Sequence, residues 1–343
     1  MRKALLFSAA IAALVLVSCN KESKSVVPDG KKVDVTVSIK GAPGTRATEV
    51  TYANEAKVNS LQVFVFNGDE REAYRNVQNA MSTLIPATSG ERTVWAVVNA
   101  PDLSGVTKLS DLRAAATKLA DNAGDSFVMT GSVTQELVDG GNVAITVKRI
   151  VARVSVAKIS TDFKDYRANF SVNVKAIYMI NVAGENKYDV GGEAGSWVNK
   201  LKHEDTDYDA LLYDAIENVN VKNGTPYEKE HVYYPYPNIY PTEGSTQDFA
   251  DNWNPRGSIL VIEAELLDGD GKLVAINEAG QTLGYYPIVL PAIERNKTYS
   301  IEEVCITRLP GDVPYKPIET GETMVTISVN DWEVGLNLGT IVI

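Results

Sequence analysis

The chain has 343 residues, of which 44% are hydrophobic and 22% are charged, and its formal net charge is −11. This composition is typical of a globular protein, and the length is enough for two domains of about 150 residues each. The negative charge argues against nucleic acid as a partner, and two histidines, His203 and His231, are too few for a His-rich metal site.

The N-terminal segment has the pattern of an export signal. Two basic residues precede an apolar run from Ala4 to Val17, which is too short and wrongly flanked for a transmembrane helix. The run ends in LVSC, which resembles the lipobox of bacterial lipoproteins, in which the cysteine is acylated after cleavage. We predict a signal peptide at residues 1–18 and a lipid anchor such as palmitate on Cys19; a plain signal peptide is the alternative.

Cysteine usage agrees with export. If Cys19 is acylated, only Cys305 remains, so no intramolecular disulfide is expected. Cys305 lies in the strand-like run YSIEEVCITRL, and we expect it to be a buried small hydrophobe. A nucleophilic role is the alternative, but no catalytic histidine accompanies it.

From Val33 onward, apolar and polar residues alternate in runs rich in Val, Ile, Tyr and Thr, separated by turn residues. This pattern predicts a mainly β fold built from antiparallel sheet. The predicted strands are residues 33–40, 58–67, 91–100, 142–160, 170–181, 258–268, 272–277, 285–290, 297–309 and 324–332.

One helix is predicted in LSDLRAAATKLADNAG, with Ser110 as its N-cap and Gly124 at its end. The apolar residues of its face are Leu109, Leu112, Ala116 and Leu119. A lone helix among strands is expected to pack over a sheet.

Two other stretches have competing interpretations. LLDGDGKLV begins like a calcium loop, but Lys272 and Leu273 stand where an EF-hand needs an oxygen ligand and a glycine, so a hairpin turn is favoured. An irregular stretch, 181–258, concentrates aromatic residues that could stack on sugars, although locking long loops onto a sheet is the favoured interpretation. These aromatics are Tyr227, Tyr233, Tyr234, Tyr236, Tyr240 and Trp253.

Enzyme motifs give no support for catalysis. The sequence contains no Gly-rich phosphate loop, CxxC pair or HExxH motif, and no spacing singles out two carboxylates as acid and base. We therefore predict no catalytic residue, no cofactor, no metal and no enzymatic activity.

The two ends of the chain are alike. Near the N-terminus Val33, Val35, Val37 and Ile39 form one apolar face, and near the C-terminus Val325, Ile327 and Val329 do the same. The tail continues with Trp332, Val334, Leu336 and Leu338. Either end could fill the same groove, and the tail from 324 to 343 would span about 65 Å if extended, more than the diameter of one domain. The alternative is that both ends are ordinary strands of their own sandwiches.

Between the first strand and the rest lies GAPGTRATEV, residues 41–50. A Gly- and Pro-flanked loop is a preferred cutting site, and Arg46 offers a specific residue to a trypsin-like protease. A cut between Arg46 and Ala47 would remove the first strand and leave one sheet edge unpaired, which invites strand addition by another copy.

Taken together, these features resemble the FimA-like fimbrillins, the subunits of type V pili of Gram-negative bacteria. The stretches that carry the resemblance, in order, are LVSC (16–19), TRAT (45–48), LQVFVFN (61–67), WAVVNAP (95–101), FVMTG (127–131), VKRIVARVSV (147–156), IYMINVAGE (177–185), VYYPYPN (232–238), YYPIVLPAIERNKTYSI (285–301) and VTISVNDWE (325–333).

The resemblance implies two tandem transthyretin-like β-sandwich domains with one short helix in the first and a C-terminal donor strand. On that basis we expect a lipidated propeptide at 19–46, an N-terminal domain at 47–160, a C-terminal domain at 161–323 and the donor strand at 324–343. It also implies an outer-membrane lipoprotein precursor that an arginine-specific protease cuts after Arg46, and a shaft subunit of an extracellular, cell-adhesive fimbrium.

The expected partners are other copies of the chain and related pilus subunits, the protease, the outer membrane, and a host or bacterial surface ligand. A minor tip or adhesin subunit and a surface glycan-binding lipoprotein are the alternative functions, and a lipid-anchored hydrolase has only the abundant acidic residues in its favour.

Overall fold

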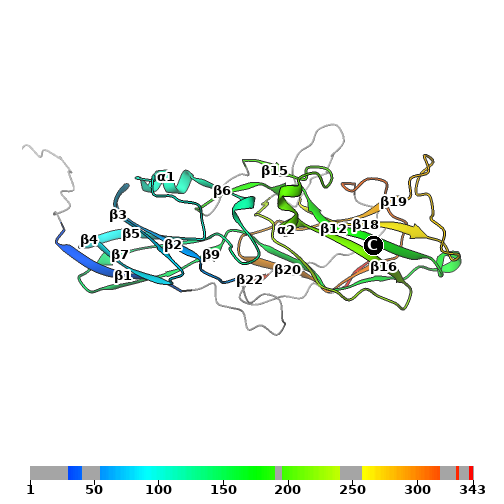
Figure 1. The fold of residues 1–343 in the computed structure, drawn as a ribbon, viewed down its shortest axis with the longest axis horizontal. Helices are drawn as coiled ribbons and strands as arrows, with labels where there is room; N and C mark the ends of the chain where they lie inside the picture. Colours follow the sequence, from blue (N-terminus) through cyan, green and yellow to red (C-terminus); the bar gives the residue numbers. More distant parts are fainter. Residues whose placement is uncertain are drawn as a thin grey trace, which may run out of the picture.

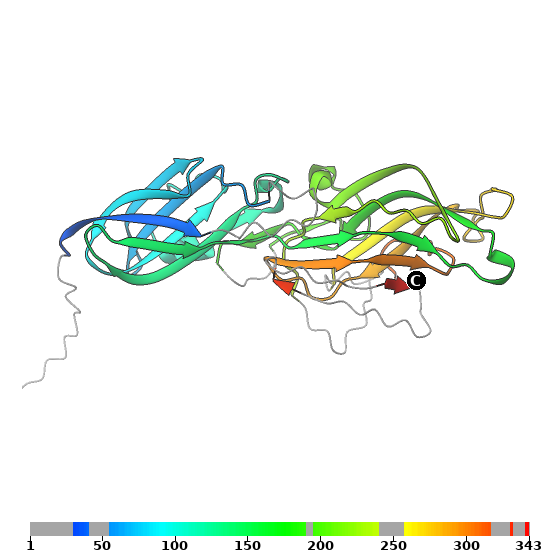
Figure 2. The same ribbon diagram turned by 90° about the horizontal axis from the view of Figure 1, so that it is seen from below.

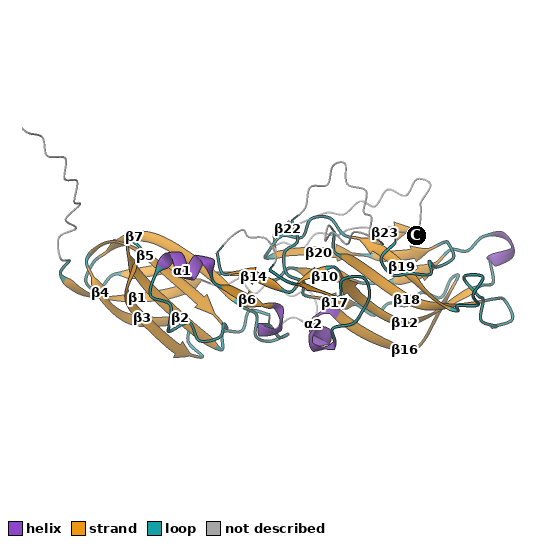
Figure 3. Ribbon diagram, turned by 90° about the horizontal axis from the view of Figure 1, so that it is seen from above, coloured by secondary structure: helices purple, strands orange, loops and turns teal. Residues whose placement is uncertain are grey.

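The computed structural model describes residues 30–40, 55–189, 195–239, 257–316, 330–331 and 340–342. The predicted mainly β fold is confirmed, since strands dominate the described chain and helices are few and short (Figure 3). The molecule is elongated, and its strands fall into two groups along the long axis, which we call the first and the second group (Figure 1).

The first group consists of two facing sheets. One has the order β3-β2-β5-β7-β9 and the other the order β4-β1-β8. Their bounds are β1 Lys32–Lys40, β2 Ser60–Asn67, β3 Glu70–Gln78, β4 Ser82–Thr88, β5 Gly90–Val98, β7 Met129–Leu137, β8 Asn142–Thr146 and β9 Lys148–Arg149. Residues of both sheets share one apolar core, which we call the groove core, so the sheets pack face to face.

The second group contains the sheets β16-β12-β18-β19, β17-β10-β20-β22 and β11-β21-β23. Their bounds are β10 Arg153–Val156, β11 Ile159–Thr161, β12 Ser171–Ile180, β16 Tyr213–Lys222, β17 His231–Tyr233, β18 Ile259–Leu267, β19 Leu283–Val289, β20 Lys297–Ile301, β21 Glu303–Ile306, β22 Asn330–Asp331 and β23 Thr340–Val342.

Shorter elements complete the described chain. These are α1 Leu109–Ala114, β6 Ala116–Lys118, η1 Leu119–Asp121, η2 Asp165–Arg167, β13 Val182–Ala183, β14 Glu185–Lys187, β15 Trp197–Val198, η3 Thr206–Tyr208 and α2 Asp209–Leu212. β14 pairs with β6, so a segment of the second half of the chain binds the first half directly.

The apolar core continues from one group into the other. A second large cluster contains Phe64 and Trp95 of the first group as well as Val172 and Ile262 of the second. Strand partners change between β9, which pairs with β7, and β10, which pairs with β17 and β20. This change precedes residue 160, where the sequence placed the boundary, and the tandem-domain division itself stays a prediction.

The predicted helix is wrong in length. It ends at Ala114, because Ala115 is extended and its carbonyl accepts a hydrogen bond from the N–H of Tyr188, which starts the β6–β14 pairing. Ser110 is not the N-cap; Lys108 holds that position. The helix does pack over a sheet, since Leu109 and Leu112 belong to the same cluster as Trp95.

Most predicted strands are confirmed, with three corrections. The run 142–160 is divided into β8, β9, β10 and β11, and 297–309 into β20 and β21. Residues 272–277 form no strand and contribute one bridge, Leu267 to Leu273, after a turn in which the Asp268 carboxylate accepts N–H bonds from Asp270 and Lys272. The favoured hairpin turn is thus confirmed.

Strands β3, β4, β7 and β16 were not predicted from the sequence. β3 and β16 carry mostly polar or half-exposed side chains, so the alternation that marks a strand is weak in them. Cys305 is another correction: it is half-exposed, because it alternates with buried Val304 and Ile306 along β21 and therefore faces away from the core.

Candidate functional site

The first strand, β1, is the middle strand of its sheet. It runs antiparallel to β4, with Lys32 to Ser38 opposite Thr88 to Ser82, and parallel to β8, with Thr36 to Lys40 opposite Asn142 to Thr146. In Figure 2 it is the dark blue strand along the first group. Its position means that two other strands depend on β1 for their backbone partners.

Side chains on the inner face of β1 fill the groove core. The four residues predicted as the displaced set are all buried, with exposed fractions of 5%, 0%, 0% and 4% for Val33, Val35, Val37 and Ile39. They pack in one cluster with Leu61, Val63 and Val65 of β2 and with Val143 and Ile145 of β8. The polar residues between them point outward, as the period-2 pattern predicts.

The central position corrects one expectation. Removing an edge strand would leave one unpaired edge, whereas removing β1 would leave two, one on β4 and one on β8. Each edge carries a row of backbone donors and acceptors that a new strand can pair with. We call the space that β1 occupies between β4 and β8 the β1 groove.

Both ends of β1 are held by the turns that flank β8. At its start the N–H of Asp34 donates to Oδ1 of Asp139, and the Asp34 carbonyl accepts from the N–H of Gly140. At its end the Lys40 carbonyl accepts from the N–H of Val147 at 3.3 Å. The covalent connection from β1 to the rest of the described chain runs through residues 41–54.

Several predicted site residues lie outside the described residues: Cys19, Arg46, Ala47, Val325, Ile327, Val329, Trp332, Val334, Leu336 and Leu338. Two short pieces of the tail are described. β22 pairs antiparallel with β20, and β23 pairs parallel with β21, so these pieces lie along the chain's own second group (Figure 2).

Tyrosines of the irregular stretch are structural where they are described. Tyr233, Tyr234 and Tyr236 are buried, and burial raises the pKa of Tyr236, whose hydroxyl accepts from Nδ2 of Asn122 at 2.9 Å. Tyr227 is half-buried against the core. Tyr240 and Trp253 lie outside the described residues.

The buried histidine, His231, belongs to a polar network that joins β16 to β17. Its Nδ1 lies 2.8 Å from Oδ2 of Asp214, and its Nε2 lies 3.0 Å from the hydroxyl of Tyr227. Burial raises the pKa of Asp214, but hydrogen bonds from His231 and Tyr233 outweigh it and bring that pKa below its ordinary value. The network ties two strands together inside the second group.

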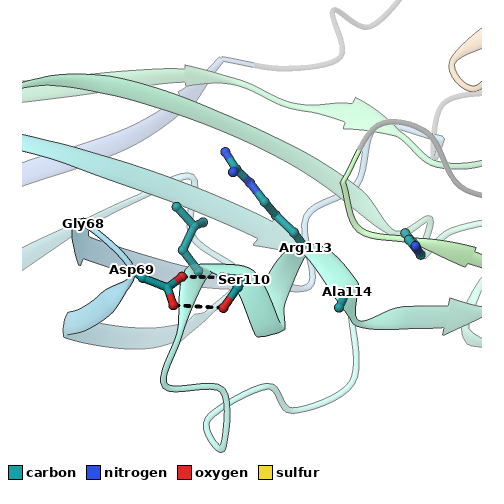
Figure 4. Close-up of a pocket in the computed structure, with 7 residues that line it drawn as sticks. Gly68, Asp69, Ser110, Arg113 and Ala114 are labelled. Atoms are coloured by element: carbon teal, nitrogen blue, oxygen red, sulfur yellow. Dashed lines mark hydrogen bonds between the residues drawn. The ribbon is translucent and has the colours of Figure 1, made fainter.

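An open pocket lies beside α1 (Figure 4). Two of its polar side chains bind each other: Asp69 accepts from the N–H and the hydroxyl of Ser110 at 2.8 and 2.9 Å, and these bonds lower the pKa of Asp69. Arg113 pairs with Asp189 at 3.3 Å. The Asp69 bonds fasten α1 to the turn between β2 and β3, and the Arg113 pair joins α1 to the segment after β14, so the pocket is a packing feature.

Within the residues that the structure describes, no three His, Cys, Asp or Glu side chains converge closely enough to hold a metal ion. None of the helices in the described part of the chain is long and apolar enough to cross a membrane.

Comparisons with known proteins agree with one family. Residues 32–193 match the family model described as the major fimbrial subunit protein FimA. The chain is 26% identical over 346 residues to the major fimbrium subunit FimA type-2 of Porphyromonas gingivalis, which covers 89% of this chain and 86% of that one. Such relatives are structural subunits of fimbriae.

Solved structures share the fold. A fimbrilin from Porphyromonas gingivalis superposes with a TM-score of 0.61 at 18% identity, covering 92% of this chain and 98% of that one. The tip fimbrial protein Mfa3 from the same organism gives 0.53 at 14% identity, covering 88% and 100%. The resemblance to the FimA-like fimbrillins is therefore confirmed, since the matching family model and the curated relative are fimbrial subunits and the solved fimbrilin shares the fold.

Proposed function

We propose that this chain is a shaft subunit exported as an outer-membrane lipoprotein, cut between Arg46 and Ala47 by an arginine-specific protease, and polymerised by strand exchange. In this exchange the C-terminal strand of one subunit enters the β1 groove of the next. The observation that supports the proposal most is the place of β1, a central strand with four buried apolar side chains that is joined onward only through residues 41–54.

Energetics make β1 a strong intramolecular competitor. Burial of four apolar side chains at roughly 1.5 to 3 kcal/mol each contributes about 6 to 12 kcal/mol of favourable free energy before any costs are subtracted. The hydrogen-bond ladders to β4 and β8 fix the register of β1. Because β1 is tethered, its effective concentration at the groove is far above that of any other subunit. Assembly should therefore wait until the cut lets β1 dissociate.

The tail contains two sets of apolar residues, one at odd-numbered and one at even-numbered positions. Val325, Ile327 and Val329 are odd-numbered, whereas Val334 and Leu336 are even-numbered, as are Trp332 and Leu338. Side chains of one strand alternate between faces, so an uninterrupted strand presents one set to the groove and the other to the opposite side. A groove of four inner positions accepts one set at a time, unless a bulge near 330–331 restores the phase.

The same cut would release the subunit from the membrane. The lipid predicted on Cys19 belongs to residues 19–46, which leave with β1. The processed chain starting at Ala47 would then have no acyl anchor and could be transferred to the growing fimbrium.

The decisive experiment compares Arg46→Ala with Lys31→Ala in cells that make the fimbrium. Lys31 is an exposed basic residue on the same side of the bond, so its variant controls for loss of charge. We expect Arg46→Ala to accumulate as a lipid-bearing monomer, and Lys31→Ala to mature with Ala47 as the first residue on N-terminal sequencing. Normal polymer from Arg46→Ala would overturn the role of the cut.

Deletion of residues 324–343 tests the donor assignment separately. The shortened chain should be cut normally but should not join other subunits, because nothing remains to fill the groove. Fibres built from the deletion variant alone would show that another segment is the donor.

A tip subunit is the second candidate, because the fold is shared with a tip fimbrial protein. Immunogold labelling of isolated fimbriae separates the two. Labels spaced along the shaft support the shaft proposal, and labels confined to one end support the tip.

A further inference from the structure

We infer that Glu55 is a positioning residue for strand exchange: it clamps the chain just after the proposed cut, so that β1 can leave while β2 stays in place. The inference rests on the proposed function. It concerns residues 55–60, which we call the clamp segment, and the contacts that hold them at the junction between the two strand groups.

Glu55 is held from both groups. Its side chain is buried, with the residue 4% exposed, and its Oε1 accepts a hydrogen bond from the Tyr234 hydroxyl at 2.7 Å. The same oxygen lies 3.5 Å from Nε of Arg153 in β10. The Glu55 backbone carbonyl accepts from Nε of Arg149 in β9 at 2.9 Å. Glu55 therefore joins the last strand of the first group to the second group.

The rest of the clamp segment is fixed by Asn99, which follows β5. Its Oδ1 accepts from the N–H groups of Asn59 and Ser60 at 2.8 and 3.2 Å, while its Nδ2 donates to the Lys57 carbonyl at 2.8 Å. The Lys57 ammonium lies 2.9 Å from Asp125. The chain is thus held at Glu55, Lys57, Asn59 and Ser60, the last of which is the first residue of β2.

The polar contacts of β1 and of the clamp share no residue, whereas Val58 of the clamp segment packs against the groove core that β1 helps to form. The last hydrogen bond of β1 joins the Lys40 carbonyl to the N–H of Val147. The clamp is bound by Arg149, two residues after Val147. None of the clamp contacts named above involves a residue of β1. Removing β1 therefore leaves these bonds of Glu55 intact.

Holding the clamp preserves the floor of the β1 groove. β2 starts directly after the clamp segment, and its Leu61, Val63 and Val65 are fully buried against the inner face of β1. A released clamp segment would let β2 fray from Ser60 at the moment when β1 no longer covers it. An intact clamp keeps the floor in shape for the incoming strand, which is a second copy's tail.

Hydrogen–deuterium exchange on the uncut exported chain tests the clamp without requiring any cut. Tyr234→Phe removes only the hydroxyl that donates to Glu55, and Glu55→Gln removes the charge at nearly constant shape. Tyr166→Phe, at an exposed tyrosine, is the matched control. We expect the amides of Asn59 and Ser60 to exchange about tenfold faster in both clamp variants, with β12 amides unchanged.

Equal exchange in clamp and control variants, or a uniform acceleration across the whole chain, would overturn the clamp. The functional arm treats each protein with an arginine-specific protease and measures capture of a synthetic peptide of residues 324–343. We expect Tyr234→Phe to capture the peptide more weakly than the control does. In a separate test, brief trypsin treatment should cut after Lys57 only in the clamp variants. Failure of the cut at Arg46 would count against the proposed function, whereas the exchange result would still decide the clamp.

Discussion

Val37 of β1 lies directly opposite Val143 of β8 in a parallel ladder, and neither residue is more than 1% exposed. Val37 also lies opposite Thr83 on the antiparallel side. A strand placed between two partners, with its side chains in the core, contributes to folding like any permanent strand. If β1 is nevertheless removed during maturation, its contribution to stability must be limited to the precursor.

Val37→Ala should destabilise the uncut chain by about 1 to 3 kcal/mol, because it removes two buried methyl groups from the groove core. The same substitution should have no effect once the chain has been cut and β1 has dissociated. Urea unfolding of both forms measures this, with Thr36→Ala, an outward-facing residue of the same strand, as the control. An equal loss in the cut form would mean that β1 stays bound.

Gly131→Ala should distort the β8 edge of the groove. A Cβ at Gly131 would overlap the carbonyl oxygen of Thr146, the last residue of β8, so the strand must shift. We expect a loss of about 1 to 3 kcal/mol in unfolding free energy, and weaker capture of a tail peptide by the cut subunit. Gly105→Ala is the control, because a Cβ there meets nothing within 4 Å. Equal behaviour of the two variants would contradict this account of the β8 edge.

Arg92→Met should destabilise both the uncut and the cut chain. The Arg92 side chain is 1% exposed, and its Nε lies 2.7 Å from Oε2 of Glu72, so the substitution strands a carboxylate beside the groove at a cost of about 3 to 5 kcal/mol.

The control for Arg92→Met is Lys175→Met. Its pair with Glu265 is more exposed, with side-chain exposures of 39% and 23%, and should contribute about 0 to 1 kcal/mol. Chemical denaturation of both variants, each in the uncut and the cut form and each against the unsubstituted chain, makes the comparison. Similar losses of unfolding free energy for the two substitutions would show that burial does not set the strength of these pairs.

Alkaline titration should separate buried from exposed tyrosines. Burial raises the pKa of Tyr188 and of Tyr299 to about 12. A folded-state pKa above the unfolded value of about 10 stabilises the fold below pH 10, and this stabilisation is lost as the pH rises through 12.

Phenolate absorbance should therefore rise in two steps, the second together with loss of the far-ultraviolet circular dichroism of the sheets. Tyr299→Phe should reduce the amplitude of the second step alone. Complete ionisation of the tyrosines while the sheets remain folded would contradict the structural role given to them.

For the candidate site, the sequence predicted the inner residues of β1 but not its neighbours. Val33 to Ile39 alternate so regularly that their common face could be identified, and all four are buried. Their partners lie far away in the chain: Thr36 pairs with Asn142. Glu55 and Asn99 were missed as well, because a single acidic or amide residue beside a strand has no pattern that distinguishes a buried clamp from a surface turn.

The helix shows the same limit. Leu109 and Leu112 at helical spacing located α1, yet Ala116 lies in the strand β6 and Leu119 begins the separate 3-10 helix η1. Pairing of β6 with β14, and the bond between Tyr188 and Ala115, replace the helical bonds there. Local periodicity could not predict that a strand about seventy residues later would pair with this segment and replace its helical hydrogen bonds.

By itself, the sequence determined which residues face inward along most strands, since alternation follows from the pleat and needs no knowledge of distant segments. Tertiary structure decided that β1 is a central strand with β4 and β8 on its two sides, and that Glu55 lies between Arg149 and Tyr234. Hydrogen-bond pairing and buried polar contacts join residues that are distant in the chain, so they depend on the assembled fold rather than on any one stretch of sequence.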